Sequence, residues 1–244
     1  MERIILKNVS KKFRIGFQKK QSILGRIINT ISGRIPTKII LAIDNISFTA
    51  QSGDIIGLIG KNGSGKSTFL RLIAGIYLRN EGEISTHGKI ISLINLSIGL
   101  KLRLTMKDNI YLIGSLLGLG YKDIKNRFDR IVEFAELDKY INTKISQLSS
   151  GMRERLVFSI AINANPDIIL LDEVFEVGDE DFKKKSARKI RELAKNGATI
   201  FLVSHELWMI EKYCNRAVLM NNGKIVDQGD GKSIIREYIK LSNN

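Results

Sequence analysis

The chain has few of the features that mark secreted or membrane-spanning proteins. Cys214 is its single cysteine, so no internal disulfide can form, and we expect a reducing compartment such as the cytosol. No basic segment followed by a long apolar stretch opens the chain, so a secretory signal is not expected. The longest apolar run, 110–120, is shorter than the roughly 18 residues that a membrane-spanning helix needs. If the protein works at a membrane, another chain is expected to cross it.

Acidic residues are scarce at the N-terminal end. The formal net charge is +14, and residues 1–40 hold ten Lys or Arg against Glu2 alone, which gives 10 − 1 = +9 of that total. A solvated basic face is the plain interpretation. Attraction to anionic lipid headgroups or to an anionic substrate is the alternative, because a cation beside an anionic membrane gains about 1 kcal/mol. Nucleic acid suits the charge equally, but no recognition motif or aromatic platform accompanies it, so no nucleic acid is expected.

Length and hydrophobic content allow one compact unit with a subdomain, since 43% of the 244 residues are hydrophobic. Short apolar runs alternate with helical patterns, which is typical of an α/β protein with a largely parallel sheet. Strands are expected at 4–9, 46–50, 55–59, 90–94, 168–171, 199–203 and 217–220, and a terminal helix at 232–241.

Two segments depart from this alternation. Residues 97–163 read as helices, so a helical subdomain is expected to interrupt a core built from 1–96 and 164–244. Residues 16–38 separate two strand-like segments and carry the one-sided apolar stripe of a short helix, with lysines before it. The stripe fits packing against the core, and the basic residues beside it also fit contact with a membrane surface.

A glycine-rich stretch follows the apolar run 55–59 and precedes a helical pattern. It has the phosphate-loop spacing and reads Gly60, Lys61, Asn62, Gly63, Ser64, Gly65, Lys66, Ser67 and Thr68. Glycines let backbone N–H groups converge on phosphate oxygens, and the following helix directs its positive end toward them. Lys66 can reach the β- and γ-phosphates, and Ser67 can ligate Mg²⁺. A strand before the loop and a helix after it favour this interpretation over a plain glycine turn.

Two acids stand at the end of the run 168–171. Because this run is apolar on both faces, we expect a central strand, with Asp172 and Glu173 at the sheet edge where open α/β sheets bind ligands. We assign Asp172 to Mg²⁺ through the water shell of the metal, and Glu173 to positioning or deprotonating the attacking water. Alone, an acidic pair after a strand is equally compatible with an ordinary loop. The upstream phosphate loop favours the catalytic interpretation.

A third motif, Leu148-Ser149-Ser150-Gly151, precedes a helical stretch at 153–163. A serine before a helix is an ordinary N-cap. The alternative is a second anion site at a helix N-terminus.

The motif order, phosphate loop, Leu-Ser-x-Gly, Asp-Glu and then Ser204-His205, resembles ABC ATPases over nearly the whole chain. The resemblance implies a phosphate-loop ABC ATPase fold in one domain, 1–244, with a mostly parallel core sheet, a small antiparallel β region and a helical subdomain. It also implies ATP and Mg²⁺ as ligands. His205 matches the catalytic switch histidine that contacts the γ-phosphate near Glu173, with Lys66 as a third catalytic residue.

The same resemblance implies a head-to-tail homodimer in the ATP-bound state. Each ATP would lie between the phosphate loop of one subunit and the segment Ser149, Ser150 and Gly151 of the other. Asp179 falls at the position of the family that lies at the dimer seam. One chain alone should therefore be a poor ATPase.

Some positions depart from the family pattern or leave a choice. Adenine usually stacks on an aromatic residue after the first strand, and Phe13 is the candidate, with Phe17 in reserve; packing of Phe13 on the sheet is equally compatible. Ser150 replaces the usual glycine. Asn95 stands nearest the expected metal-binding glutamine and can offer an amide oxygen with shorter reach.

Three features look like the branch that exports O-antigen, capsular polysaccharide and teichoic acid: Ser-Ser-Gly-Met at 149–152, the segment 172–184, and the insertion within 17–41. In that branch the implied partner is an integral membrane permease, and the chain lies at the cytoplasmic face of the inner membrane, with the 16–38 insertion at its anionic surface. An exporter of another amphipathic substrate, or a soluble ABC ATPase acting on nucleic acid or ribosomes, is the alternative. A kinase would leave 148–151 and Ser204-His205 unexplained.

Overall fold

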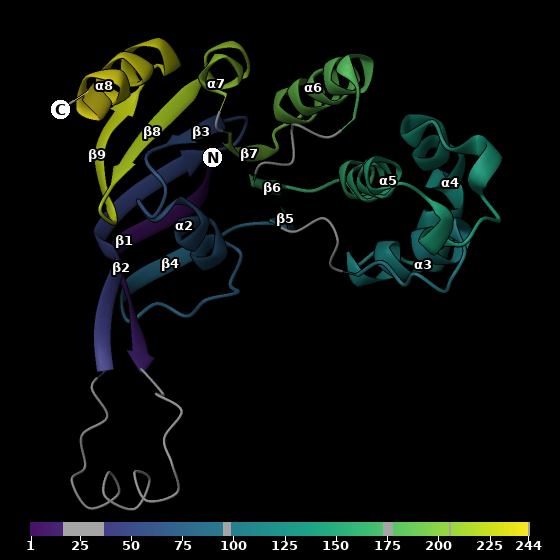
Figure 1. Cartoon of the computed structure of the whole chain (residues 1–244), viewed down its shortest axis with the longest axis horizontal. Helices are drawn as coiled ribbons and strands as arrows, with labels where there is room; N and C mark the ends of the chain where they lie inside the picture. Colours follow the sequence, from purple (N-terminus) through teal and green to yellow (C-terminus); the bar gives the residue numbers. More distant parts are fainter. Residues whose placement is uncertain (17–36, 95–98, 173–177, 205, 244) are drawn as a thin grey trace, which may run out of the picture.

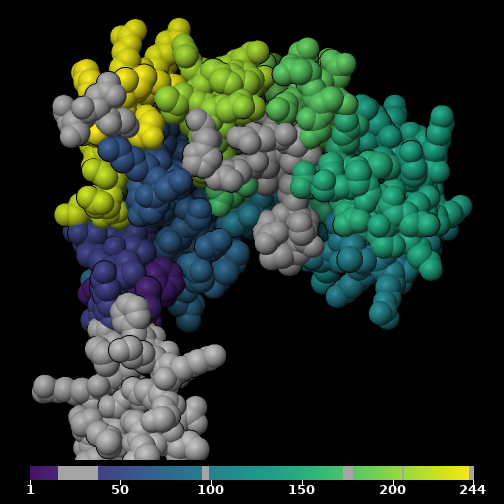
Figure 2. Space-filling view, in the orientation of Figure 1, coloured from purple at the N-terminus to yellow at the C-terminus, as the bar shows by residue number. Residues whose placement is uncertain are grey.

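A computed structural model describes residues 1–16, 37–94, 99–172, 178–204 and 206–243. Two sheets and a group of helices make up the molecule, and residues 99–163 form a separate lobe at one side, teal in the space-filling view (Figures 1 and 2). The predicted α/β class is confirmed. The predicted amphipathic helix of the 16–38 insertion falls within 17–36, outside the described residues.

The larger sheet has six strands. In spatial order they are β5 (Ile90–Leu93), β6 (Ile168–Asp172), β7 (Thr199–Val203), β3 (Ile55–Ile59), β8 (Arg216–Asn221) and β9 (Lys224–Gly229). The first five are parallel, and β9 is antiparallel to β8. Every residue of β3 and β7 is buried, as expected when helices or a second sheet cover both faces.

The smaller sheet is antiparallel and contains β1 (Glu2–Gly16), β2 (Thr37–Gln51) and β4 (Glu81–Thr86). β1 and β2 pair along their length, and the far end of this hairpin, where Gly16 lies opposite Thr37, projects from the body (Figure 1). Both strands are longer than predicted. No residue is buried in their outer ends, 11–15 and 38–42, so the alternation of apolar and polar residues that identifies a half-buried strand is lost there.

Alternate residues of the large sheet serve two different cores. Ile168 and Leu170 face α2 (Lys66–Ile73) and the small sheet, where the rings of Phe48, Phe69 and Phe201 lie 5.8–6.1 Å apart. Ile169 and Leu171 instead join the core that includes the helical lobe. The large sheet therefore contributes side chains to both cores, one core on each of its faces.

The helical lobe contains α3 (Met106–Leu116), α4 (Tyr121–Ala135) and α5 (Ser150–Ile162), with short 3-10 turns at Asp138–Tyr140 and Ile145–Gln147. Thr105 and Asp108 form a capping box at the start of α3, so its first backbone N–H groups have local acceptors. Helix α5 begins at Ser150, earlier than the predicted 153. The lobe lies within 97–163, the stretch that we assign to the helical subdomain.

Three further helices lie in the described part of the chain: α6 (Glu180–Lys195), α7 (Leu207–Tyr213) and α8 (Gly231–Asn243). Phe182 of α6 meets Phe134 of α4 and Phe158 of α5 with ring centroids 5.7 and 6.1 Å away, which joins α6 to the helical lobe. Helices α7 and α8 pack on Ile59, Ala217 and Leu219. None of the described helices has the length and apolar character to span a membrane.

Candidate nucleotide-binding site

The glycine-rich loop connects β3 to α2 and has a backbone that requires glycine. Gly60, Gly63 and Gly65 have φ angles of 154°, 79° and 109°, values that residues with a side chain rarely adopt. A Cβ atom on Gly60 would lie 2.3 Å from the carbonyl oxygen of Met220, and one on Gly65 would lie 2.8 Å from that of Ala42. The loop is therefore pressed against β8 and β2, and its shape is built into the core.

Helix α2 begins without a side-chain cap. Its N-cap residue is Gly65, and its first turn contains no acidic residue, so the N-terminal N–H groups have no carboxylate of that turn to bind. Such a helix end carries about half a positive charge and favours an anion. The hydroxyl of Ser64 is buried with no hydrogen-bond partner among the described residues, which adds an unsatisfied polar atom to the same loop.

The ammonium group of Lys66 is held by the loop itself. Its Nζ donates to the carbonyl oxygens of Gly60 at 2.6 Å and Lys61 at 3.1 Å, and the residue is 9% exposed. A buried cation that curls back over a loop of backbone N–H groups is suited to multiply charged phosphate. Ser67 and Thr68 follow in the first turn of α2.

Asp172 ends β6 at the same sheet edge as the loop. It lies opposite Val203 of β7, and Val203 lies opposite Leu58 of β3, just before Gly60. Because neighbouring strands are about 4.8 Å apart, the backbone of Asp172 is ~10 Å from that of Leu58. This separation suits a carboxylate that reaches a loop-bound group through a metal or water.

Ser149, Ser150 and Gly151 stand at the start of α5. The hydroxyl of Ser149 accepts a hydrogen bond from the backbone N–H of Met152 at 3.2 Å, so Ser149 is the N-cap that its type and position favour. Both serines are exposed, and no atom of the described residues lies within 4 Å of a Cβ built on Gly151. The helix end is open to a ligand from outside the chain.

The two phosphate-binding candidates of the chain do not face each other. Helix α2 lies with the small sheet, whereas α5 lies in the helical lobe, and the two are clearly separated in Figure 1. One subunit therefore does not bring the Ser149 segment to its own phosphate loop.

Phe13 is half-buried on β1 and packs edge-on against Tyr77, with ring centroids 5.2 Å apart. Lys11 lies over both rings, 5.0 Å from the centroid of Phe13 and 5.8 Å from that of Tyr77. Tyr77 just follows α2, so the Phe13 ring belongs to the same end of the molecule as that helix. Its stacking on adenine stays a prediction.

Four predicted residues lie outside the described ones: Phe17, Asn95, Glu173 and His205. Their roles stay predictions. Ser204, directly before His205, is buried, and its hydroxyl accepts from the backbone N–H of Glu206 at 3.0 Å.

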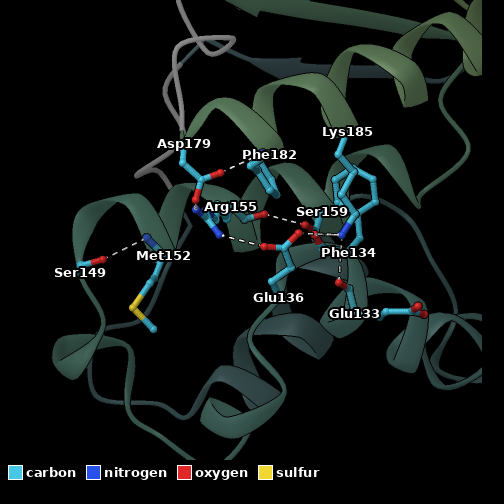
Figure 3. Close-up of polar contacts among 10 residues, drawn as sticks. All are labelled: Glu133, Phe134, Glu136, Ser149, Met152, Arg155, Ser159, Asp179, Phe182 and Lys185. Carbon is cyan, nitrogen blue, oxygen red and sulfur yellow. Dashed lines mark hydrogen bonds and ion pairs between the residues drawn. The ribbon is translucent and has the colours of Figure 1, made fainter.

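One set of contacts was not anticipated from the sequence. Arg155 of α5 bridges Asp179 and Glu136, which lie far from it in the chain (Figure 3). A helical pattern identifies Arg155 as a polar residue on a mostly apolar helix, but nothing in the spacing pairs it with those acids.

A parallel sheet with a strand, a phosphate-cradling loop and an uncapped helix at its carboxyl edge defines a phosphate-loop nucleotide-binding protein. The model of the family described as ABC transporter matches residues 43–176, more than half of the chain. The chain is 43% identical over 198 residues to the O-antigen export system ATP-binding protein RfbB of Klebsiella pneumoniae, covering 81% of this chain and 80% of that one. The chain belongs to the ABC transporter family and is an ATP-binding cassette ATPase, as the motif order predicts.

Further relatives and solved structures agree. Identity is 37% over 233 residues with the teichoic acids export ATP-binding protein TagH of Staphylococcus epidermidis, covering 96% of this chain and 86% of that one. The ATP-binding subunit of an ABC transporter matches with a TM-score of 0.77 and 22% identity, covering 97% and 93% of the two chains. A dimeric ATP-binding cassette in a post-hydrolysis state, bound to ADP and Pi, matches with a TM-score of 0.75 and 23% identity, covering 93% and 98%. These two structures establish the fold.

Proposed function

We propose that this chain is the ATP-hydrolysing subunit of an exporter of lipid-linked cell-surface polysaccharide. The observation that carries the proposal is the similarity over most of the chain to ATP-binding proteins of O-antigen and teichoic acid export, two systems that move cell-surface glycans. Both relatives are covered over at least 80% of their length, so the similarity extends beyond the common ATPase motifs.

Nucleotide binding in this proposal begins with the phosphate loop. The open N–H groups of α2 and the ammonium of Lys66 neutralise the phosphates, and Phe13 stacks on adenine. Mg²⁺ would be held by the hydroxyl of Ser67 and, through its water shell, by the carboxylate of Asp172; these are the hard oxygen donors that Mg²⁺ prefers. Asn95 would add an amide oxygen, and the metal would lower the negative charge that develops on the phosphates.

A homodimer completes the site. Because α5 lies away from the phosphate loop of its own chain, the open helix end at Ser149 is available to a phosphate held by another subunit. Glu173 then orients or deprotonates the water, and His205 contacts the γ-phosphate, both as predicted from the motif order. ATP joins the subunits, and hydrolysis releases them.

The membrane side of the proposal rests on the projecting hairpin. Ile15, Ile39, Ile40 and Leu41 are each between 39% and 58% exposed there. Arg14 and Lys38 share the same stretch of paired strands. Apolar and basic side chains together suit an anionic lipid surface. We place the chain at the cytoplasmic face of the inner membrane, bound to an integral permease.

Deletion of the gene tests the function directly. The deletion strain should lose surface polysaccharide and accumulate the lipid-linked glycan inside the cell, and the wild-type gene should restore export. A gene with Glu173→Gln, whose product should bind ATP and form a stable dimer without turnover, should not restore it. Normal surface glycan in the deletion strain would overturn the proposed substrate, and near-normal hydrolysis by the variant would remove Glu173 from its role.

A further inference from the structure

Arg155 stands where α5, α6 and the end of α4 meet. It lies on α5, the helix whose first turn contains the Ser149 segment, and its side chain is 18% exposed. Figure 3 shows its guanidinium between the carboxylates of Asp179 and Glu136. Nη2 donates to Oδ2 of Asp179 at 2.5 Å, Nη1 donates to Oε2 of Glu136 at 3.3 Å, and the group lies 5.0 Å above the ring of Phe182.

Both carboxylate oxygens of Asp179 accept hydrogen bonds here. Its second oxygen, Oδ1, accepts the backbone N–H of Phe182 at 2.9 Å and so caps α6. That N–H bond and then the hydrogen bond from Arg155 lower the pKa of the Asp179 carboxyl below its ordinary value, so the group is ionised at neutral pH.

The residue before Asp179 is fitted to the same arginine. Gly178 has a φ of 86°, and a Cβ there would lie 3.2 Å from Nε of Arg155 and 3.0 Å from Cδ1 of Phe182. Backbone and side chain of the pair Gly178–Asp179 are thus both held against Arg155. In the sequence this pair closes the segment that starts from Asp172 and Glu173.

Stability alone accounts poorly for this arrangement. The Asp179 side chain is 63% exposed and that of Glu136 is 48% exposed, so water screens both ion pairs, and exposed pairs contribute little to the free energy of unfolding. Two directed hydrogen bonds and a ring contact nevertheless fix the orientation of a planar guanidinium. These contacts therefore fix the orientation of Arg155 more than they add to the free energy of unfolding.

We propose that Arg155 is a positioning residue that links the two half-sites of one subunit. In the proposed homodimer, the Ser149 end of α5 completes the ATP site of the partner, whereas Asp172, seven residues before Asp179 in the sequence, serves the subunit's own ATP. Arg155, on the same helix as the Ser149 end, contacts Asp179 directly. Occupation of one ATP site is thereby transmitted to the other, and hydrolysis becomes cooperative. This inference rests on the homodimer of the proposed function.

The test compares variants of the purified full chain. Arg155→Met removes the link. Lys185→Met is the matched control. Nζ of Lys185 pairs with Oε1 of Glu136 at 3.1 Å, so the residue belongs to the same network, but none of its hydrogen bonds among the described residues reaches Asp179. Fluorescent-ATP binding, the rate of hydrolysis against ATP concentration, and the urea midpoint of unfolding are measured for each.

Arg155→Met should bind nucleotide with an affinity near that of the wild type, since its side chain lies away from the phosphate loop. Its kcat should fall about tenfold to a hundredfold, the usual effect of misplaced site residues, and its Hill coefficient should fall from near 2 toward 1. Arg155→Lys, which retains the charge without the fork of donors, should recover part of the cooperativity. The control should keep both values.

Asp179→Asn provides a second, milder variant, since its amide oxygen can still cap α6. It should reproduce the loss of cooperativity, and the double variant should be no worse than either single one, because both remove the same contact. A lower urea midpoint with unchanged kcat and Hill coefficient in Arg155→Met and in Asp179→Asn would leave a structural role only and overturn the inference. A wild-type chain that neither dimerises with ATP nor hydrolyses it cooperatively would instead count against the proposed function.

Discussion

Replacing Gly60 by Ala should destabilise the protein more than the same replacement at Gly63, in a way that the loop geometry specifies. Both glycines have positive φ, so both variants suffer backbone strain of about 1–3 kcal/mol. Only at Gly60 does the added Cβ meet fixed atoms, 2.3 Å from the carbonyl oxygen of Met220 and 2.6 Å from Oγ of Ser64. A Cβ on Gly63 would have no atom of the described residues within 4 Å, apart from those of Gly63 and its two chain neighbours.

The difference in stability between the two variants reports on the close contact with Met220, which only Gly60→Ala introduces. Met220 belongs to the buried strand β8, so its backbone cannot retreat without disturbing the sheet. Overpacking of this kind costs about 1–3 kcal/mol. For a chain of this length each kcal/mol lowers the melting temperature by ~2–4 °C, so Gly60→Ala should melt ~2–12 °C below Gly63→Ala.

Thermal unfolding of the nucleotide-free variants, followed by circular dichroism, measures this difference. Gel filtration checks that each variant is folded and in the same oligomeric state before heating. Equal melting temperatures for Gly60→Ala and Gly63→Ala would refute the reasoning, because they would mean that the loop does not press against β8.

Three further changes have defined outcomes. Lys66→Met should weaken the binding of fluorescent ATP by about tenfold to a hundredfold, the range for lost charged hydrogen bonds, with little change in the unfolding midpoint; unaltered affinity would remove Lys66 from the site. Cys214 is half-buried, and desolvation of its thiol raises the pKa to about 12, so iodoacetamide at pH 8 should modify native protein more slowly than protein in urea, and equal rates would contradict the raised pKa. The pKa of Asp179 is lowered on folding, so its stabilising contribution is present above the ordinary value near 4 and is lost as the pH falls through the lowered value. Asp179→Asn should therefore flatten the acid limb of a plot of urea midpoint against pH, and an unchanged limb would place the titration elsewhere.

Most of the large sheet was predictable because its strands are short and apolar on both faces. The runs at Ile55–Ile59 and Thr199–Val203 match β3 and β7 residue for residue. Burial on both sides leaves no room for polar residues, so the pattern survives in the sequence. The phosphate loop was predictable for the related reason that its glycines are needed locally, by φ angles and by contacts with neighbouring backbone.

The strands β4 and β9 were missed. β4 reads Glu-Gly-Glu-Ile-Ser-Thr, and only Ile84 of it packs against a core, whereas β9 is similarly polar at the sheet edge. Strands of this kind are specified by the neighbour they pair with, which a single sequence does not display. The contact between Arg155 and Asp179 was missed because it depends on how α6 packs beside α5, a tertiary relation without a spacing signature.

The pairing of Gly16 with Thr37 at the far end of the hairpin has a consequence for how such proteins diversify. The two strand ends are held together by ladder pairing that continues inward to β2 beside the phosphate loop, where Ala42 approaches Gly65. The ladder therefore brings Gly16 and Thr37 together by its own pairing. We therefore expect the phosphate loop to keep its geometry when the segment between Gly16 and Thr37 is changed in length or sequence, so that different attachments can be carried at this one junction.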